Sequence, residues 1–206
     1  MTMLTNSKKL IIEKLANVMD DEKIKCCDFE NEECENITVS KKEFEYCKFN
    51  NMVLQNNELE RNVFRNVMFE NCNFSNTEFN ECTFIRCKFH NCKFTGCNLV
   101  ENFMHDVTFK ETNASFMNLS RVKIEVSQFK DTILKNSYFQ ETKIKSTNFD
   151  EVDLTQAQFL NTSLNKIDLS SCKIEGIAIS IEDIKGAIIE PFQLIDLAYL
   201  IGVNLK

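Results

Sequence analysis

Cysteine and histidine are the residues of this chain most able to do chemistry, since thiolates and imidazoles act as nucleophiles, bases and metal ligands. There are ten cysteines and two histidines in 206 residues. A metal site needs ligands that converge on one point, and a disulfide needs two thiols at a fixed separation. Four of the cysteines instead follow one another at intervals of five residues, at Cys82, Cys87, Cys92 and Cys97. That spacing must be explained before either chemistry is assigned.

The five-residue spacing runs through most of the chain. Every fifth residue from Ile24 to Ile179 is apolar, which gives 32 consecutive positions, here called centres, and 15 of the 18 phenylalanines lie on them. Neither a helix, with a period of 3.6 residues, nor a strand, with a period of 2, explains this pattern. A strict period indicates a repeat architecture. The centres that we predict to form the core are Phe64, Phe69, Phe74, Phe79, Phe84, Phe89, Phe94 and Phe109.

Two further positions define each unit. The residue two before the centre is mostly small or apolar and is expected to point inward, and eight of the ten cysteines lie there. The residue two after the centre is Asn in ten units and Gly at Gly96 and Gly176. Both residue types accept the positive φ that the third residue of a type II turn requires. Each unit is therefore predicted to be a short straight side followed by a corner.

This pattern resembles the pentapeptide-repeat family, whose consensus is A-(D/N)-L-x-x and whose members tend to have Phe or Leu at the centre. The resemblance implies an all-β solenoid, a right-handed quadrilateral β-helix with four units per coil. The register then predicts about eight coils over residues 21–180 and a rod about 38 Å long, at roughly 4.8 Å per coil. Residues 1–20 are expected to form an N-terminal helical cap, and residues 181–206 a C-terminal helix and strand.

On this reading the cysteines are packing residues. Consecutive units lie on different walls, so the thiols of the Cys82 to Cys97 series do not converge on a metal. Cysteines one coil apart have parallel side chains, which is poor disulfide geometry. We expect ten reduced thiols and neither a metal nor another cofactor. A redox or metal-handling protein built on the cysteines is the least favoured alternative.

Catalysis finds little support in the sequence. His90 and His105 are both predicted to point outward, from different walls. The chain has no Ser-His-Asp arrangement, glycine-rich phosphate loop or HExxH motif, and a filled tube offers no pocket. We therefore expect that the protein is not an enzyme.

The ends depart from the repeat. Leu10, Ile11, Leu15 and Val18 follow helical spacing after Asn6 or Ser7, either of which could cap a short helix. Distorted geometry is expected before about Phe44, because charged residues occupy inward positions there: Glu22, Glu32 and Lys42.

After Ile179 the chain is expected to form one helical turn at Glu182 to Gly186. A helix should follow from Pro191 to Leu200, ending at Gly202, and residues 203–205 could add a strand. This helix is apolar on more than one face, and a cap needs only one apolar face. We therefore predict a head-to-head homodimer through Phe192, Leu194, Ile195, Leu197, Tyr199, Leu200 and Ile201.

The charge distribution is uneven. The net charge is −7, and residues 1–60 hold 13 acids and 8 bases, whereas residues 61–110 hold 5 acids and 6 bases. A surface that binds nucleic acid directly would be basic, and this one is not. The acidic run from Asp20 to Glu35 is either a solvated end or a docking patch for a basic partner. There is no 18-residue apolar run and no signal peptide, so we expect a cytoplasmic protein outside the membrane.

The chain also looks like a loop-free member of the Qnr-type proteins within this family. That resemblance implies an interaction protein that binds DNA gyrase and topoisomerase IV as a mimic of duplex DNA and protects them from fluoroquinolones. The unbroken register lacks the two loops of many Qnr-type proteins, and the mildly basic middle departs from a pure charge mimic. The alternative is a structural or adaptor module that binds another protein. Candidate contact residues are the large outward aromatics and the acids of the first coil: Phe103, Phe116, Asp28, Glu30, Glu33 and Glu35.

Overall fold

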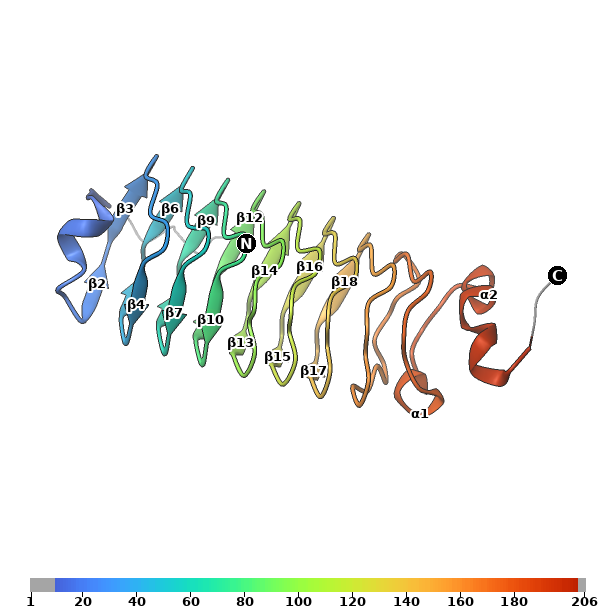
Figure 1. Ribbon diagram of the computed structural model, residues 1–206. Coiled ribbons are helices and arrows are strands. Elements are labelled where there is room, and N and C mark those ends of the chain that lie inside the picture. The colour runs from blue at the N-terminus through green and yellow to red at the C-terminus, as the bar shows by residue number, and fades with distance from the viewer. Residues whose placement is uncertain (1–9, 204–206) are drawn as a thin grey trace.

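The computed structural model describes residues 10–203, and these form a rod of stacked coils. The chain rises by one coil every twenty residues, so that residue i lies against residue i+20, as in the register of Phe49 with Phe69. Figure 1 shows the coils in sequence order from the N-terminal end to the helical C-terminal end. The predicted all-β solenoid is confirmed.

Parallel strands of two to four residues form three sheets, which lie on three of the four walls. The first wall is the 7-stranded sheet of β2 (Lys23–Lys25), β5 (Glu43–Glu45), β8 (Val63–Arg65), β11 (Thr83–Ile85), β13 (Phe103–His105), β15 (Lys123–Glu125) and β17 (Lys143–Lys145). The second wall is the 8-stranded sheet of β1 (Ile11–Ile12), β3 (Cys27–Glu30), β6 (Lys48–Asn50), β9 (Met68–Glu70), β12 (Lys88–His90), β14 (Thr108–Lys110), β16 (Gln128–Lys130) and β18 (Asn148–Asp150).

The other two walls rely more on isolated bridges. The third wall consists of single-residue bridges such as Asn73 to Lys93. The fourth wall has β4 (Thr38–Ser40), β7 (Glu58–Glu60) and β10 (Glu78–Asn80), and bridges continue it through Ala178. About seven coils therefore carry regular strands, against eight expected from the register, because the last coil pairs only through bridges.

The corners lie where the sequence placed them. Positive φ occurs two residues after the centre in nearly every unit, for example at Asn51 (φ 53°) and Asn71 (φ 54°). Gly96 (φ 69°) is a corner where an added Cβ would lie 2.7 Å from Oδ1 of Asn76, so that amide would have to move. Bulky residues nevertheless occupy some corners, including Phe116 (φ 61°) and Val126 (φ 52°). The stacked coils hold these residues in a conformation that they avoid elsewhere.

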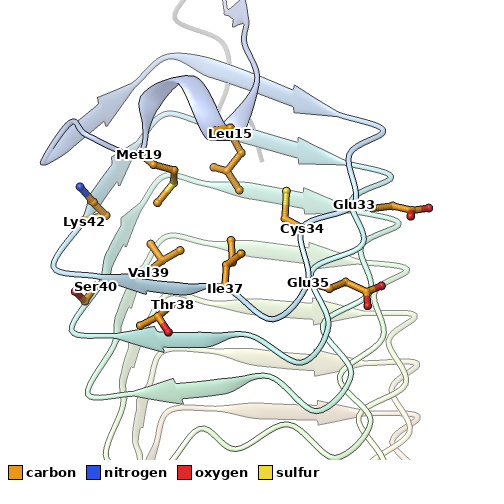
Figure 2. A pocket seen from close by; sticks show the side chains of 11 residues that line it. Leu15, Met19, Glu33, Cys34, Glu35, Ile37, Thr38, Val39, Ser40 and Lys42 are labelled. Carbon is orange, nitrogen blue, oxygen red and sulfur yellow. The ribbon is translucent and has the colours of Figure 1, made fainter.

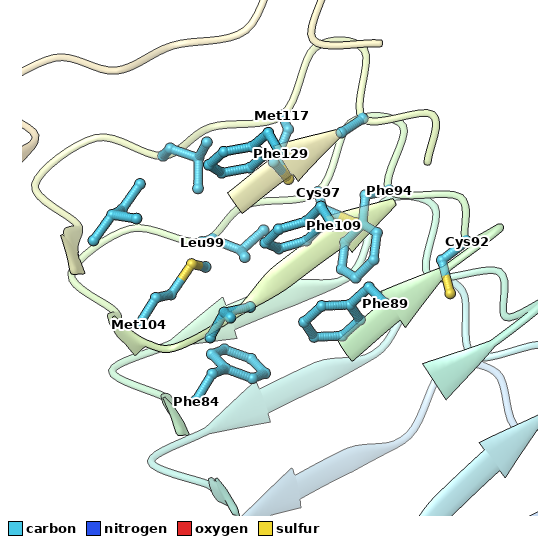
Figure 3. Close-up of a cluster of buried hydrophobic side chains, with 14 of the residues drawn as sticks. Phe84, Phe89, Cys92, Phe94, Cys97, Leu99, Met104, Phe109, Met117 and Phe129 are labelled. Carbon is cyan, nitrogen blue, oxygen red and sulfur yellow. The ribbon is translucent and has the colours of Figure 1, made fainter. Parts of the chain in front are cut away.

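The interior is filled by side chains of the centres. All eight predicted core phenylalanines are buried, at most 4% exposed. Along one wall the rings stack one coil apart, with centroids 4.7 Å apart for Phe69 and Phe89 and for Phe89 and Phe109. Between walls they meet edge to face, as Phe89 and Phe94 do at 5.1 Å. Figure 3 shows this cluster, and both ring geometries are favourable for aromatic pairs.

The sequence did not identify several buried polar side chains at the second inward position. Asn62 is fully buried; its Oδ1 accepts from the backbone N–H of Lys42 at 2.8 Å and its Nδ2 donates to the carbonyl of Val39 at 2.8 Å. Asn57 bonds the coil below it in the same way. These amides satisfy backbone groups that the strand ladder leaves free, which offsets the cost of burying them.

The N-terminal cap differs from the expected helix. Residues Ile11–Ile12 form β1, which pairs with β3, and only Leu15–Val18 are helical, as a single 3-10 turn, η1. The helix predicted from the spacing of Leu10 and Ile11 is therefore wrong. Pairing with the exposed edge of the second wall satisfies more backbone N–H and C=O groups than a short helix would. Glu32, at an inward position, accepts from the N–H of Leu15 at 3.1 Å. The expected caps Asn6 and Ser7 lie outside the described residues.

The C-terminal end agrees better with expectation. Ser180 caps α1 (Ile181–Ile184) by accepting from Asp183 N–H at 3.0 Å. Then η2 (Pro191–Gln193), α2 (Leu194–Leu197) and η3 (Ala198–Ile201) follow without a break. They end at Gly202, which has φ 70°. Residues 204–205 of the expected terminal strand lie outside the described residues.

The register makes a stability prediction at Phe79, which is 1% exposed. Phe79→Ala should lower the free energy of unfolding by about 3–5 kcal/mol, because the stacked coils cannot collapse into the cavity. Asn76→Gly, three residues earlier at a corner with φ 57°, is the matched control and should cost less than about 1 kcal/mol. Urea unfolding followed by circular dichroism measures both. Equal losses would contradict the assigned register.

Candidate functional site

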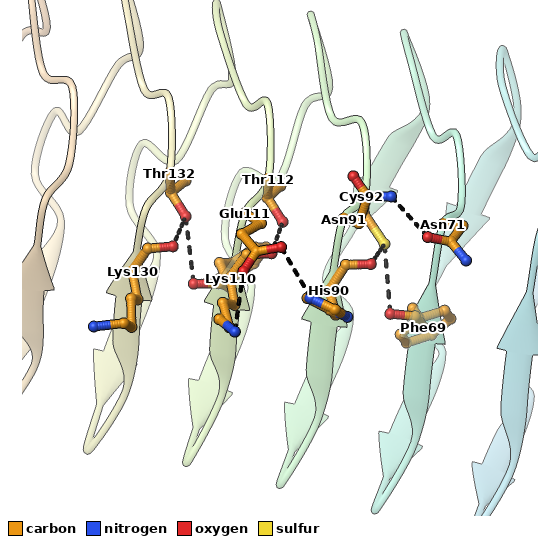
Figure 4. Close-up of polar contacts among 11 residues, drawn as sticks. Phe69, Asn71, His90, Asn91, Cys92, Lys110, Glu111, Thr112, Lys130 and Thr132 are labelled. Carbon is orange, nitrogen blue, oxygen red and sulfur yellow. Dashed lines mark hydrogen bonds and ion pairs between the residues drawn. The ribbon is translucent and has the colours of Figure 1, made fainter.

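The two histidines lie on different walls. Nε2 of His90, on the second wall, is 3.2 Å from the carboxylate of Glu111, and Nδ1 of His105, on the first wall, is 3.6 Å from Glu125. Figure 4 shows the His90 contact beside the cysteine and threonine ladder of the neighbouring column. Both are half-exposed pairs between adjacent coils, with no nucleophile in the same contact. In residues 10–203 no group of three or more His, Cys, Asp or Glu side chains could hold a metal ion.

Buried cysteines point into the rod, where their thiols donate hydrogen bonds to backbone carbonyls of the preceding coil. The thiol of Cys72 donates to the carbonyl of Phe49 at 3.4 Å, and that of Cys97 to the carbonyl of Phe74 at 2.8 Å. Burial raises the pKa of Cys87 to about 12 and that of Cys82 to about 11. All ten cysteines are free thiols in the structure. A buried thiol with a raised pKa is a poor nucleophile, so Cys82 and Cys87 act as small, weakly polar packing groups.

The predicted contact residues do not come together. Asp28 and Glu30 lie on the second wall and Glu33 and Glu35 on the third, around the corner at Asn31. Burial and the nearby carboxylate of Glu30 raise the pKa of Asp28.

The two aromatic candidates are also apart. Phe103 is on the first wall, half-buried, with the ammonium of Lys123 5.2 Å from its ring centroid. Phe116 is at the corner between the third and fourth walls and is 54% exposed. Phe103 is therefore partly covered by its own chain, and Phe116 is the more exposed of the two.

The fourth wall has a pattern that the sequence analysis missed. Between its corners, from Thr38 to Ser180, it has no basic side chain. Its N-terminal half carries Glu58, Glu60 and Glu78, and Glu58 and Glu78 are register partners on adjacent strands. Like charges placed opposite each other destabilise a sheet, so this arrangement weakens the fold. Reading outward residues in columns of twenty would have revealed it.

The C-terminal half of the same wall carries a few exposed apolar side chains among uncharged polar ones. Phe116, Tyr138 and Leu160 are 54%, 36% and 42% exposed. Each is twenty-two residues after the last, which is one coil up and two residues along. They therefore form a diagonal stripe that rises from the corner across the fourth wall.

The C-terminal segment both closes the rod and leaves an apolar surface. Gln193 is buried and donates to the carbonyls of Leu169 and Cys172 at 2.9 and 2.7 Å, and the hydroxyl of Tyr199 donates to the carbonyl of Ile177 at 2.5 Å. Leu197 is 8% exposed and packs on the core. By contrast, four apolar side chains of this segment are 60–73% exposed: Phe192, Leu194, Ile195 and Ile201.

The segment predicted to form the dimer contact is therefore divided between the cap and the surface. Leu197 and Leu200 contact their own core, whereas Leu194 and Ile201 face solvent. Gln193 was overlooked because a glutamine in an apolar run gives no burial signal.

A parallel β-solenoid whose interior is packed with the side chains of the centres, with surface ion pairs and buried thiols, defines a repeat protein. Family profiles give the particular family: the pentapeptide repeat region matches residues 62–132, and an eight-copy pentapeptide-repeat profile matches residues 127–176. The chain belongs to the pentapeptide-repeat family. A comparison with curated proteins gave no match. In the described residues, no helix is long and apolar enough to cross a membrane.

Solved structures with a similar fold include full-length QnrB1, a plasmid-mediated fluoroquinolone resistance protein. Its TM-score is 0.46 at 12% identity, over 85% of this chain and all of that one (100%). A second is HetL from the cyanobacterium Nostoc, involved in regulating heterocyst differentiation, with a TM-score of 0.38 at 11% identity, over 81% of this chain and 89% of that one. Similarities of this size carry no functional argument.

The burial of the thiols predicts their reactivity. At pH 8 a thiol with a pKa of about 12 is ionised to about one part in 10⁴, so Cys47, Cys87 and Cys97 should resist alkylation in the native protein. The half-exposed Cys26 and Cys34 should react first. Mass spectrometry after iodoacetamide treatment should show these two modified in buffer and all ten in denaturant. Native modification of Cys87 as fast as Cys26, or thiols that stay unmodified in unreduced, denatured protein, would contradict this.

Proposed function

We propose that this protein acts by binding another protein along its outer walls, and that the partner is a type II topoisomerase, DNA gyrase or topoisomerase IV, which it protects from fluoroquinolones. The observation that favours binding over catalysis is the filled interior, which leaves only outer surfaces for recognition. The choice of partner comes from the resemblance to Qnr-type proteins. A structural or adaptor module with a different protein partner is the alternative.

The fourth wall is the proposed contact surface. Glu58 and Glu78 stand one coil apart, and no cation lies between its corners to neutralise them. A protein surface that binds DNA is basic and would meet such a wall with complementary charge. The diagonal stripe beyond the acids adds apolar contact area.

The imitation of DNA is partial. Duplex DNA carries one charge per about 1.7 Å of axis, whereas a column of acids on this rod has one charge per about 4.8 Å. At the corner that follows the fourth wall, Arg61 forms an ion pair with Glu81, and Arg121 forms one with Glu101. Apolar contacts at the stripe must therefore supply part of the affinity.

A supercoiling assay tests the function. Micromolar protein should restore supercoiling by gyrase that is poisoned with ciprofloxacin. Glu58→Gln/Glu78→Gln should weaken protection about tenfold, because it removes the uncompensated charge, and Phe116→Asn should also weaken it. Asp131→Asn/Glu151→Gln, at exposed corners between the second and third walls, is the matched control and should protect like the wild type. Failure of the wild type with both gyrase and topoisomerase IV would favour the adaptor alternative.

We also propose that two copies associate head to head through the C-terminal segment. Phe192, Ile195 and Ile201 are 65–73% exposed at one end of the rod, where a monomer rarely keeps an apolar patch in water. A twofold contact covers this patch with one self-complementary surface. The acidic regions of the first coil would then lie at the two far tips.

Light scattering measures the assembly. The wild type should have about twice the chain mass at micromolar concentration, and Phe192→Glu/Ile195→Glu should give a folded monomer. Ile133→Glu/Leu160→Glu, at exposed apolar positions on the third and fourth walls, is the control and should remain dimeric. A monomeric wild type at high concentration would overturn the dimer. Leu197→Glu should instead destabilise the chain, because Leu197 belongs to its own cap.

A further inference from the structure

A cleft of about 560 Å³ lies at the N-terminal end of the rod, between η1 and β4. Figure 2 shows Leu15 and Met19 of the cap facing Ile37 and Val39 of the coil below. The rim carries polar groups, among them Glu33, Glu35, Thr38, Ser40 and Lys42.

The backbone of β4 is open on the side of this cleft. β4 is an edge of the three-stranded sheet β10-β7-β4. The backbone polar groups of Ile37 and Val39 point toward β7; for example, Glu58 N–H donates to the carbonyl of Ile37 at 2.9 Å. Because N–H and C=O alternate along a strand, those of Thr38 and Ser40 point the other way. No strand among residues 10–203 pairs with them. Such an edge is a template for another strand.

The cap explains why this edge is open. A strand before β4 would come from residues 18–20, twenty residues earlier, but these form the end of η1 and a turn, closed by Asp21 N–H donating to the carbonyl of Val18 at 3.1 Å. On the second wall, β1 covers the corresponding edge, where Ile11 N–H donates to the carbonyl of Cys26 at 2.8 Å. Within residues 10–203, the second wall is thus capped by a strand and the fourth is not.

Apolar surface accompanies the open edge. Cys34, Ile37 and Leu59 occupy inward positions, yet they remain half-exposed, unlike their counterparts further along the rod. An apolar side chain at the centre of an added strand would cover them. The site therefore combines unpaired backbone groups with an apolar floor, as in recognition by strand addition.

We propose that this cleft binds an extended segment of a partner protein as an additional strand beside β4. The segment has an apolar residue at its centre and a basic residue at the end next to Glu33 and Glu35. Charge selects this occupant, since residues 10–60 hold 13 acids and 6 bases, and Lys23 and Lys25 are already paired with Glu43 and Glu45. A second copy of the chain would bring two acidic ends together.

Binding is tested with the full chain and a short fluorescein-labelled peptide of alternating valine and threonine, with arginine at its ends. Fluorescence anisotropy should show saturable binding below about 1 mM. The same peptide with N-methyl groups on alternate backbone nitrogens should bind at least tenfold more weakly, because it cannot complete the ladder. Absence of binding, or equal binding of the methylated peptide, would overturn the proposal.

Variants locate the site. Ser40 precedes the positive-φ corner at Lys41, a position of a type II turn that accepts proline. Thr38→Pro/Ser40→Pro removes two outward N–H donors and leaves the backbone bonds to β7, although the bond from the Thr38 hydroxyl to Glu58 is lost. It should lower the affinity at least tenfold without loss of fold by circular dichroism. Glu33→Gln/Glu35→Gln should weaken binding, most at low salt, whereas Glu141→Gln/Glu175→Gln, far along the rod, should not.

The other occupants give different results. If the proline variant changes the oligomeric state of the protein without peptide, then a second copy pairs with β4, and the proposal is wrong. If removal of residues 1–9 raises the peptide affinity at least tenfold, then the chain's own N-terminal segment competes for the cleft, and a partner segment is not its normal occupant. Unchanged affinity in the proline variant places the peptide elsewhere and overturns the site.

Discussion

The structure depends on the pairing of each residue with the one twenty positions later. Backbone hydrogen bonds between adjacent coils recur along the rod. Near one end, Asn31 N–H donates to the carbonyl of Asn50 at 3.0 Å, and near the other end, Lys173 N–H donates to the carbonyl of Val152 at 3.0 Å. The pairing places each centre directly above another centre, so rings stack inside and charged residues form ladders outside. It also imposes the left-handed corners, because a coil of four short sides closes only if the chain turns sharply after each one. Packing, burial and surface pattern all follow from this register.

The register is also why so much of the fold is predictable from sequence. A period of five cannot come from a helix or a strand, so the centres, the inward cysteines and the corners were identified residue by residue, and Phe79 and Asn71 lie where they were placed. The ends have no such repeat. Ile11 fits a helical stripe equally well, and only the open edge of β3 makes it a strand. Gln193 has no apolar character, so its burial depends on carbonyls that the last coil leaves free.

The candidate surfaces were harder to predict than the core. Sequence analysis selected Phe103 and Phe116 by size alone, but the wall of each determines what it can contact, and Lys123 covers one of them. The fourth wall emerges only when outward residues are read in columns of twenty. Its acids, its apolar stripe and the open edge of β4 lie on one face of the rod. That face is therefore the one that we propose contacts other molecules.

The unbroken register has one more consequence, for the dimensions of the molecule. Removing or adding twenty residues in the middle would delete or insert one coil and leave every remaining pair in place. An indel of five, ten or fifteen residues would move the following units to another wall, and a length that is not a multiple of five would move the centres out of their inward position. The distance between the open edge of β4 and the apolar C-terminal end is thus set in steps of about 4.8 Å. The length of the rod can therefore change by whole coils during evolution while both of its ends stay the same.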